Sequence, residues 1–256
     1  MQEKSALGRA MAMVRDLRVR CDWDRVQTRE TLRPYLIEEV HELDSAVAAN
    51  DPEAIRHEVA DLLLHLAWQL VLAEEHGEFS SDDVATDLEA KMQRRHPHLF
   101  ELGPAEEWER LKARERQLSS GVARPGVLDG LPPTLPDLLL AFRLQQRAAG
   151  VGFDWPDASG PAAKVREELA EVEAEIALGE AVATERLDHE IGDLLFSVVN
   201  LARKVGVHPG PALGRANQRF THRFGHVERL TEERGIDLAD AGLAQLDLLW
   251  EEAKRG

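Results

Sequence analysis

Residues 57–71 read HEVADLLLHLAWQLV, and this stretch decides the fold of the chain. It is mostly apolar, which predicts a helix that packs against other helices. Glu58 and Asp61 nevertheless lie within it, and at about 100° per residue they share one face with His65 and Gln69. A buried carboxylate without a compensating charge is strongly unfavourable. The helix therefore needs a source of positive charge.

The composition favours helices and excludes several kinds of site. Ala, Leu, Glu and Arg dominate the 256 residues, and they are strong helix formers. The net charge of −16 argues against nucleic acid as a partner. The single cysteine, Cys21, excludes an internal disulfide and a multi-cysteine metal site. With no apolar leader and no uncharged apolar run of membrane-spanning length, we expect a cytoplasmic protein that does not cross a membrane.

Two similar halves flank a stretch rich in Gly, Pro and Ser, SSGVARPGVLDGLPPTLP, at residues 119–136. Such a stretch between long helical patterns is typical of a linker. We predict an N-terminal helical domain over residues 1–118, a linker over 119–133 and a C-terminal helical domain over 134–256.

The two predicted domains repeat the same motifs in the same order. An Asp-Trp pair comes first, then Glu-Glu-x-x-Glu, Glu-x-x-Asp, a basic helix and a Trp/Lys pair. The repeated motifs are CDWD and FDWP, IEEVHEL and REELAEV, HEVADLLLHLA and HEIGDLLFSVVNLA, KMQRRHPHLF and RFTHRFGHVE, and WERLK and WEEAK. The repeat keeps charged residues as well as apolar ones, so it indicates a duplicated chemical site.

The repeated acidic motifs predict a metal site in each half. If the two helices that carry them pack side by side, four carboxylates converge and repel one another. A hard divalent cation relieves that repulsion, and a set made only of oxygen ligands favours Mg²⁺, with Mn²⁺ as a substitute. A single Glu-rich helix is more often a solvated surface; it is the pairing and the repetition that favour metal.

Arg215, Arg219 and Arg223 follow one another at intervals of four residues. This spacing aligns them on one face of a helix, where they suit contact with phosphate. The alternative is a surface helix held by salt bridges. The Trp250/Lys254 pair fits either stacking on a base with a phosphate contact or simple aromatic packing.

At these residues the chain resembles the MazG family of nucleoside triphosphate pyrophosphohydrolases over almost its whole length. The family's metal motif is EExxE, a spacer and ExxD, and the phrases VLDGLPPTLP, VGFDWP and GDLLFSVVNLAR add specificity. The resemblance implies an all-α fold made of a tandem repeat of two MazG-like domains, with four-helix-bundle cores built on dimerisation. It also implies Mg²⁺-dependent hydrolysis of nucleoside triphosphates to the monophosphate and pyrophosphate, with the C-terminal half favoured as the main site.

Carried over by position, the resemblance also assigns site residues. The metal ligands would be Glu168, Glu171, Glu190 and Asp193 in the C-terminal half and Glu39, Glu42, Glu58 and Asp61 in the N-terminal half. The nucleotide contacts would be Lys164, Arg219, Arg223, Trp250 and Lys254, with Lys91, Arg95, Trp108 and Lys112 as the N-terminal set. Arg219 stands where the family has a lysine, which affects reach and therefore substrate preference.

The residues leave the reaction partly open. Glu38 or Glu167, the extra acid of each Glu-Glu pair, fits the role of orienting the attacking water or acting as its base. Attack at the α-phosphorus follows from the resemblance, whereas the residues alone fit loss of the γ-phosphate equally well. The main alternative is a regulatory protein that senses nucleotide or metal without turnover. A di-iron bundle is disfavoured, because only Glu38-x-x-His41 fits its Glu-x-x-His motif.

Overall fold

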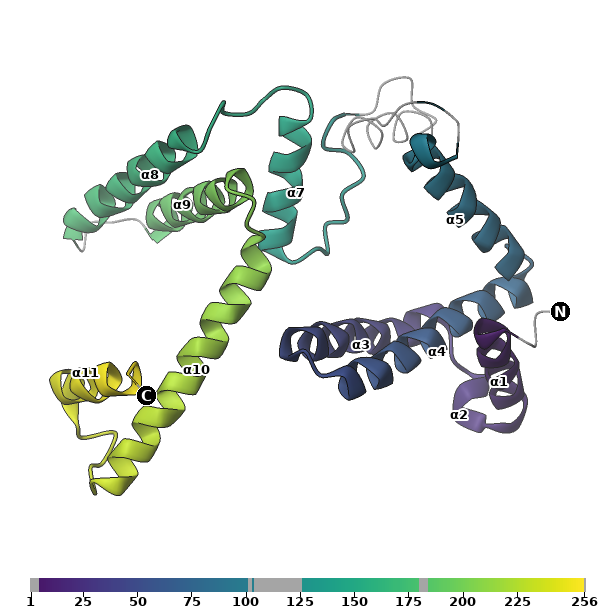
Figure 1. Ribbon diagram of the computed structural model, residues 1–256, viewed down its shortest axis with the longest axis horizontal. Helices are drawn as coiled ribbons and strands as arrows, with labels where there is room; N and C mark the ends of the chain where they lie inside the picture. The colour runs from purple at the N-terminus through teal and green to yellow at the C-terminus, as the bar shows by residue number, and fades with distance from the viewer. Residues whose placement is uncertain (1–4, 101–102, 104–125, 180–183, 256) are drawn as a thin grey trace. The chain divides into compact units, whose positions relative to one another are not determined.

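The computed structural model describes residues 5–100, 103, 126–179 and 184–255 (Figure 1). Every regular element in these ranges is helical, which confirms the predicted all-α fold class. Within the same ranges, no helix combines the length and the apolar character needed to cross a membrane. The chain divides into two compact units, Met1–Glu106 and Glu107–Gly256.

The N-terminal unit is organised around one long helix, α4. Helices α1 and α3 both pack on it, and the core between them contains Met11, Val14, Leu32, Trp68 and Leu72. The elements of this unit are α1 (Ala6–Arg20), α2 (Asp22–Arg25), α3 (Arg29–Ala49), α4 (Pro52–His76), α5 (Ser81–Arg95) and the 3₁₀ helix η2 (Pro97–Leu99).

Local sequence fixes the turn that makes α3 and α4 antiparallel. Asn50 ends α3 in the left-handed conformation, with φ 53°. The Asp51 side chain then accepts hydrogen bonds from the backbone N–H groups of Glu53 and Ala54, and Pro52 occupies the first turn of α4. An acidic N-cap followed by proline is a strong helix start. The two acidic motifs are therefore brought face to face by a short and well-defined connection.

Only the second part of residues 57–71 is buried as the pattern predicts. His65, Trp68 and Val71 lie in the core, whereas Val59 and Leu66 are about half exposed within this chain. The predicted packing of this helix against other helices is confirmed by its contacts with α1 and α3, which leave part of the stretch uncovered within this chain. The N-terminal part of α4, which carries Glu58 and Asp61, therefore also exposes apolar side chains such as Val59.

The C-terminal unit repeats the helix pair and adds a long arm. Helices α7 and α8 pack on α9, and α10 starts beside α7 and α9 and extends away to pair with α11 (Figure 1). Val227, Leu230, Leu249 and Ala253 form the small core of that second pair. The helices are α7 (Asp137–Ala149), α8 (Ser159–Ala177), α9 (Thr184–Lys204), α10 (Pro209–Glu233) and α11 (Gly242–Ala253).

A half-buried ion-pair network attaches the Asp-Trp turn to α9. The Asp154 carboxylate accepts hydrogen bonds from both terminal nitrogens of Arg203, at 2.5 and 3.2 Å, and from Lys204 Nζ at 3.0 Å. These contacts, led by the Arg203 hydrogen bond, lower the pKa of Asp154 from 3.8 to about 2. The turn that precedes α8 is thereby fixed against the helix that carries Glu-x-x-Asp.

Replacing Asp154 with Asn should destabilise the protein in a pH-dependent way. A pKa lowered from 3.8 to about 2 corresponds to about 2 kcal/mol of stability that is present at neutral pH and lost as the pH falls from about 4 toward 2. Urea unfolding of Asp154→Asn should show a deficit of about that size at pH 7 which shrinks below pH 4. Asp188→Asn, an exposed change on α9, is the control. Equal stability of D154N and wild type at pH 7 would contradict this assignment.

Candidate functional site: two acidic clusters on paired helices

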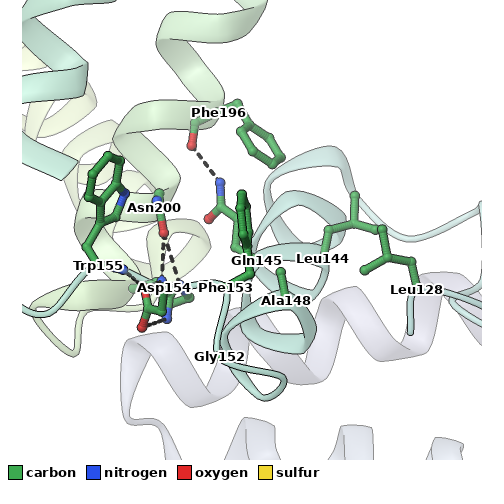
Figure 2. Close-up of a pocket in the computed structure, with 11 residues that line it drawn as sticks. Leu128, Leu144, Gln145, Ala148, Gly152, Phe153, Asp154, Trp155, Phe196 and Asn200 are labelled. Atoms are coloured by element: carbon green, nitrogen blue, oxygen red, sulfur yellow. Dashed lines mark hydrogen bonds and ion pairs between the residues drawn. The ribbon is translucent and has the colours of Figure 1, made fainter. Parts of the chain in front are cut away.

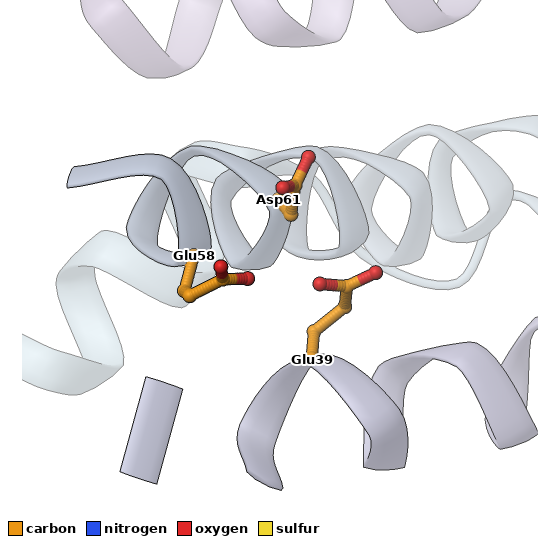
Figure 3. Close-up of side chains that lie close together, drawn as sticks. All are labelled: Glu39, Glu58 and Asp61. Carbon is orange, nitrogen blue, oxygen red and sulfur yellow. The ribbon is translucent and has the colours of Figure 1, made fainter. Parts of the chain in front are cut away.

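Three carboxylates meet across the α3–α4 pair in the N-terminal unit. Glu39 comes from α3, and Glu58 and Asp61 come from α4, one turn apart (Figure 3). Each offers an oxygen, and these oxygens all lie within 4.8 Å of one another. Glu39 and Glu58 are half-buried and Asp61 is exposed. The cluster is thus open to a ligand on one side and backed by protein on the other.

The N-terminal cluster carries uncompensated negative charge. Burial raises the pKa of Glu39, and repulsion by Asp61, Glu42, Glu58 and Glu38 raises it further. The pKa of Glu42, one turn along α3, is raised by desolvation and then by Glu58 and Glu38. Shifts in this direction mean that ionisation is opposed by the surroundings. A bound cation would favour the ionised carboxylates and lower their pKa values.

The α8–α9 pair holds the corresponding C-terminal cluster. Glu168 and Glu171 of α8 and Glu190 of α9 again offer oxygens within 4.8 Å of one another. Glu168 is buried, whereas Glu171 is exposed. The same two motifs therefore converge in both units, as the internal repeat predicts.

Lys164 compensates part of the charge in the C-terminal cluster. Its Nζ lies 2.5 Å from Glu168 Oε1 and 2.8 Å from Glu167 Oε1, one turn along α8. The Lys164 ammonium lowers the pKa of Glu168 and is itself held in the protonated form. Glu171 hydrogen-bonds to Glu168, and this contact, together with desolvation, raises its pKa. The two clusters thus share a geometry but differ in their charge balance.

Two of the predicted ligands lie beside these clusters. Asp193 sits one turn after Glu190 on α9, and its Oδ2 is 3.4 Å from His189 Nε2. Glu42 sits one turn after Glu39, close enough to Glu58 for the two to interact. Glu38 and Glu167 adjoin cluster members in sequence and are exposed. Each unit therefore presents three of its four predicted ligands together and the fourth within one helical turn.

The basic residues of the C-terminal half form a separate site. Arg219 and Arg223 of α10 line an open pocket of about 530 Å³ together with Lys254, which follows α11. Arg215 lines it too, as does His222, which the sequence analysis did not single out although it stands three residues after Arg219. None of the residues of the acidic cluster lines this pocket. Within one chain, the acidic and basic sets occupy different places.

The Trp/Lys pair is packed in the described C-terminal unit. Trp250 lies against Phe220, with ring centroids 5.3 Å apart, and Lys254 Nζ is 6.0 Å from the centre of the Trp250 ring. Aromatic packing, one of the two predicted alternatives, is therefore present. In the N-terminal unit, Lys91 and Arg95 lie one turn apart on α5, a helix that carries no member of the acidic cluster. Trp108 and Lys112 lie outside the described residues.

The fold and the clusters define a class of protein: an all-α chain with two helix pairs, each presenting a group of carboxylates, and a separate basic pocket. Comparison with known proteins gives the family. Residues 27–100 match the MazG nucleotide pyrophosphohydrolase domain. The chain is 40% identical to the nucleoside triphosphate pyrophosphohydrolase/pyrophosphatase MazG of Thermotoga maritima, covering 92% of this chain and 90% of that protein. It is 38% identical to the nucleoside triphosphate pyrophosphohydrolase of Escherichia coli K12, covering 96% and 94%. The chain belongs to the MazG family.

Neutralising one acid of the N-terminal cluster should stabilise the protein when divalent ions are removed. Glu39→Gln relieves repulsion by its acidic neighbours, so the melting temperature of this variant in chelator should exceed that of wild type. Added Mg²⁺ should raise the melting temperature of wild type more than that of E39Q. Glu89→Gln on α5 is a matched exposed control. A lower melting temperature for E39Q in chelator would count against charge repulsion in this cluster.

Proposed function

We propose that the protein hydrolyses nucleoside triphosphates to the nucleoside monophosphate and pyrophosphate. The observation that carries the proposal is the repeated convergence of carboxylates from facing helices in a member of the MazG family. The names of the Thermotoga maritima and Escherichia coli relatives support the same activity. A part in clearing unwanted nucleotides from the cellular pool is consistent with this chemistry.

We propose Mg²⁺, with Mn²⁺ as a substitute, as the metal of both clusters. The clusters offer carboxylate oxygens, the ligands that these hard cations prefer. The raised pKa values of Glu39, Glu42 and Glu171 also fit groups that await a cation. The ligands would be Glu39, Glu42, Glu58 and Asp61 in one half and Glu168, Glu171, Glu190 and Asp193 in the other. When bound, the ion would offset the charge of the triphosphate oxygens and hold them in place.

The protein's own basic residues would complete the phosphate site. Arg219, Arg223 and Lys254 already line one pocket, and Trp250 lies beside them. Lys164 would move from Glu168 to a phosphate oxygen once a cation compensates that carboxylate. Lys91 and Arg95, with Trp108 and Lys112, are the corresponding proposal for the N-terminal half. The C-terminal half is proposed as the main site because its basic set is gathered in one pocket.

The exposed acid of each Glu-Glu pair would handle the water. Glu167 adjoins the buried ligand Glu168 and accepts a hydrogen bond from Lys164, and Glu38 adjoins Glu39 in the same way. A carboxylate placed next to the ligands can orient the nucleophile and accept its proton. We propose the α-phosphorus as the point of attack.

A homodimer of chains with domains 1–118 and 134–256 would bring the separate acidic and basic sets together. The α8–α9 pair exposes large apolar side chains, among them Leu169, Ile176 and Leu195. A second helix pair packed on this face would bury them and complete a four-helix core. The basic arm of α10 and α11 could then approach a partner's acidic cluster, which it does not reach within its own chain.

Replacing Glu171 with Ala should remove C-terminal activity while leaving the helices intact. The substitution deletes one ligand at an exposed position, so we expect pyrophosphate release to fall at least about 100-fold with little change in circular dichroism. Glu173→Ala, an exposed change on the same helix, should keep wild-type activity. The parallel variant Glu42→Ala measures the contribution of the N-terminal half. Full activity in E171A would refute the assignment of Glu171.

Hydrolysis in ¹⁸O-labelled water distinguishes the possible points of attack. Attack at the α-phosphorus places the label in the monophosphate, attack at the β-phosphorus places it in pyrophosphate, and attack at the γ-phosphorus places it in inorganic phosphate. We expect label in the monophosphate alone, read by mass spectrometry. Absence of turnover with any common triphosphate in Mg²⁺ or Mn²⁺ would favour the alternative of a nucleotide or metal sensor.

A further inference from the structure

A buried polar side chain in each unit has an atom without a hydrogen-bond partner in the described part of the chain. The two atoms are Gln145 Oε1 and His65 Nδ1. Gln145 lines a cavity of about 520 Å³ between α7, α9 and the turn before α8, together with Asn200 (Figure 2). His65 belongs to α4 and shares a helix face with Glu58 and Asp61. The unpaired nitrogen therefore lies on the helix face that carries the N-terminal acidic cluster.

The imidazole of His65 is buried in a neutral form. The side chain is 6% exposed, and its Nδ1 is shielded from solvent. Burial lowers the pKa of His65, although the nearby Asp61 carboxylate acts in the opposite direction. A neutral imidazole has one N–H donor and one acceptor nitrogen. A buried nitrogen without a partner is unfavourable, so His65 is poised to accept a partner that comes within reach.

The geometry of the helix directs His65 toward Asp61. Asp61 precedes His65 by four residues, and helical side chains lean toward the N-terminus, over the preceding turn. The electrostatic effect of Asp61 on His65 shows that the two groups are close enough to interact. Asp61 is exposed, so its carboxylate is free to rotate. One carboxylate oxygen can thus face the cluster while the other turns toward the ring of His65.

A carboxylate that binds a metal through one oxygen needs a donor for the other. Such ligands are commonly oriented by a hydrogen bond from a residue that does not itself touch the metal. We propose that His65 is this positioning residue, and that its Nδ1–H donates to Asp61 when a divalent cation occupies the N-terminal cluster. The inference rests on the metal site proposed for that half. The contact pairs the buried nitrogen and leaves the other Asp61 oxygen for the ion.

The first helix of each pair shows why the N-terminal cluster needs a donor from elsewhere. In the C-terminal unit, the Lys164 ammonium of α8 lies beside Glu168. Aligning Glu39 with Glu168 places Tyr35 at the position of Lys164. Tyr35 packs edge-on against Trp23, with ring centroids 6.1 Å apart. Helix α3 therefore has an aromatic contact at the position where α8 supplies an ammonium group.

The second helix of each pair differs in the opposite sense. In the register of the repeat, His65 corresponds to Ser197 and Trp68 corresponds to Asn200. Ser197 is also buried, at 8% exposure, but its hydroxyl extends less far than an imidazole. The nitrogen donor beside the acids thus comes from the first helix in the C-terminal unit and from the second helix in the N-terminal unit.

Manganese binding to the full chain tests this inference. A Glu171→Ala parent weakens the C-terminal cluster, and electron paramagnetic resonance of free Mn²⁺ then reports on the N-terminal one. In this parent, His65→Leu should weaken Mn²⁺ binding at least about tenfold, because Asp61 loses its donor. His65→Gln keeps an N–H donor and should restore the affinity to within about threefold of the parent. In a Glu58→Ala parent, which leaves the C-terminal cluster intact, H65L should not change the affinity.

Thermal unfolding in chelator separates positioning from packing. Leucine removes a buried nitrogen that has no partner, so H65L should melt at or above the temperature of its parent even though it binds Mn²⁺ more weakly. A packing role would lower the melting temperature and the affinity together, with no recovery of affinity in H65Q, and that result would overturn the inference.

A second variant decides the question if circular dichroism shows that H65L does not fold. His65→Ser copies Ser197 and should also weaken Mn²⁺ binding at least about tenfold. Binding equal to that of the parent in either folded variant would overturn the inference. Failure of the Glu171→Ala parent itself to bind Mn²⁺ would instead count against the metal site proposed for the N-terminal half.

Discussion

Repulsion between carboxylates on neighbouring helices is the constraint on which the rest of the structure depends. In the α3–α4 pair and in the α8–α9 pair, packing of the two helices brings carboxylates from both helices close together. The N-terminal pair leaves this repulsion uncompensated, as the raised pKa of Glu39 records. The C-terminal pair moderates it with Lys164, whose ammonium lies beside Glu168. The two halves thus differ in how the charge of their acidic clusters is balanced.

The sequence predicts the fold class and the cluster geometry because both follow from local periodicity. Glu58 and Asp61 must share a helix face at their spacing, and Asn50 with Asp51 must end one helix and begin the next. The Lys164–Glu168 ion pair follows the same i, i+4 rule, although the sequence alone did not suggest it. The separation of Arg219, Arg223 and Lys254 from the acidic cluster could not be predicted, because it depends on the direction in which α10 leaves α9.

Matching motifs do not have matching surroundings. Asp22 and Asp154 belong to the same repeated Asp-Trp pair, yet the Asp22 side chain is 93% exposed and that of Asp154 is 22% exposed. The cause lies on the facing helix, where Val71 of α4 stands in place of Arg203 of α9. The N-terminal unit instead fixes the end of α1 through Arg18, which donates to Glu75 and to the backbone oxygens of Asp24 and Gln27. Asp22 and Asp154 therefore differ in burial and in their ion-pair partners, and the Asp-Trp motif itself determines neither.

This difference bears on why both acidic sets persist in one chain. Trp68 packs against Arg18 and belongs to the N-terminal core, so opening a cavity there would remove a large buried side chain and lower stability. Asn200 contributes less packing, and the cavity beside it leaves Gln145 with an unpaired acceptor. The two units thus differ at this position, because the N-terminal unit keeps a filled core and the C-terminal unit keeps a cavity. Carboxylates that repel one another also destabilise their helix pair, so the N-terminal cluster lowers the stability of a unit whose core is otherwise filled.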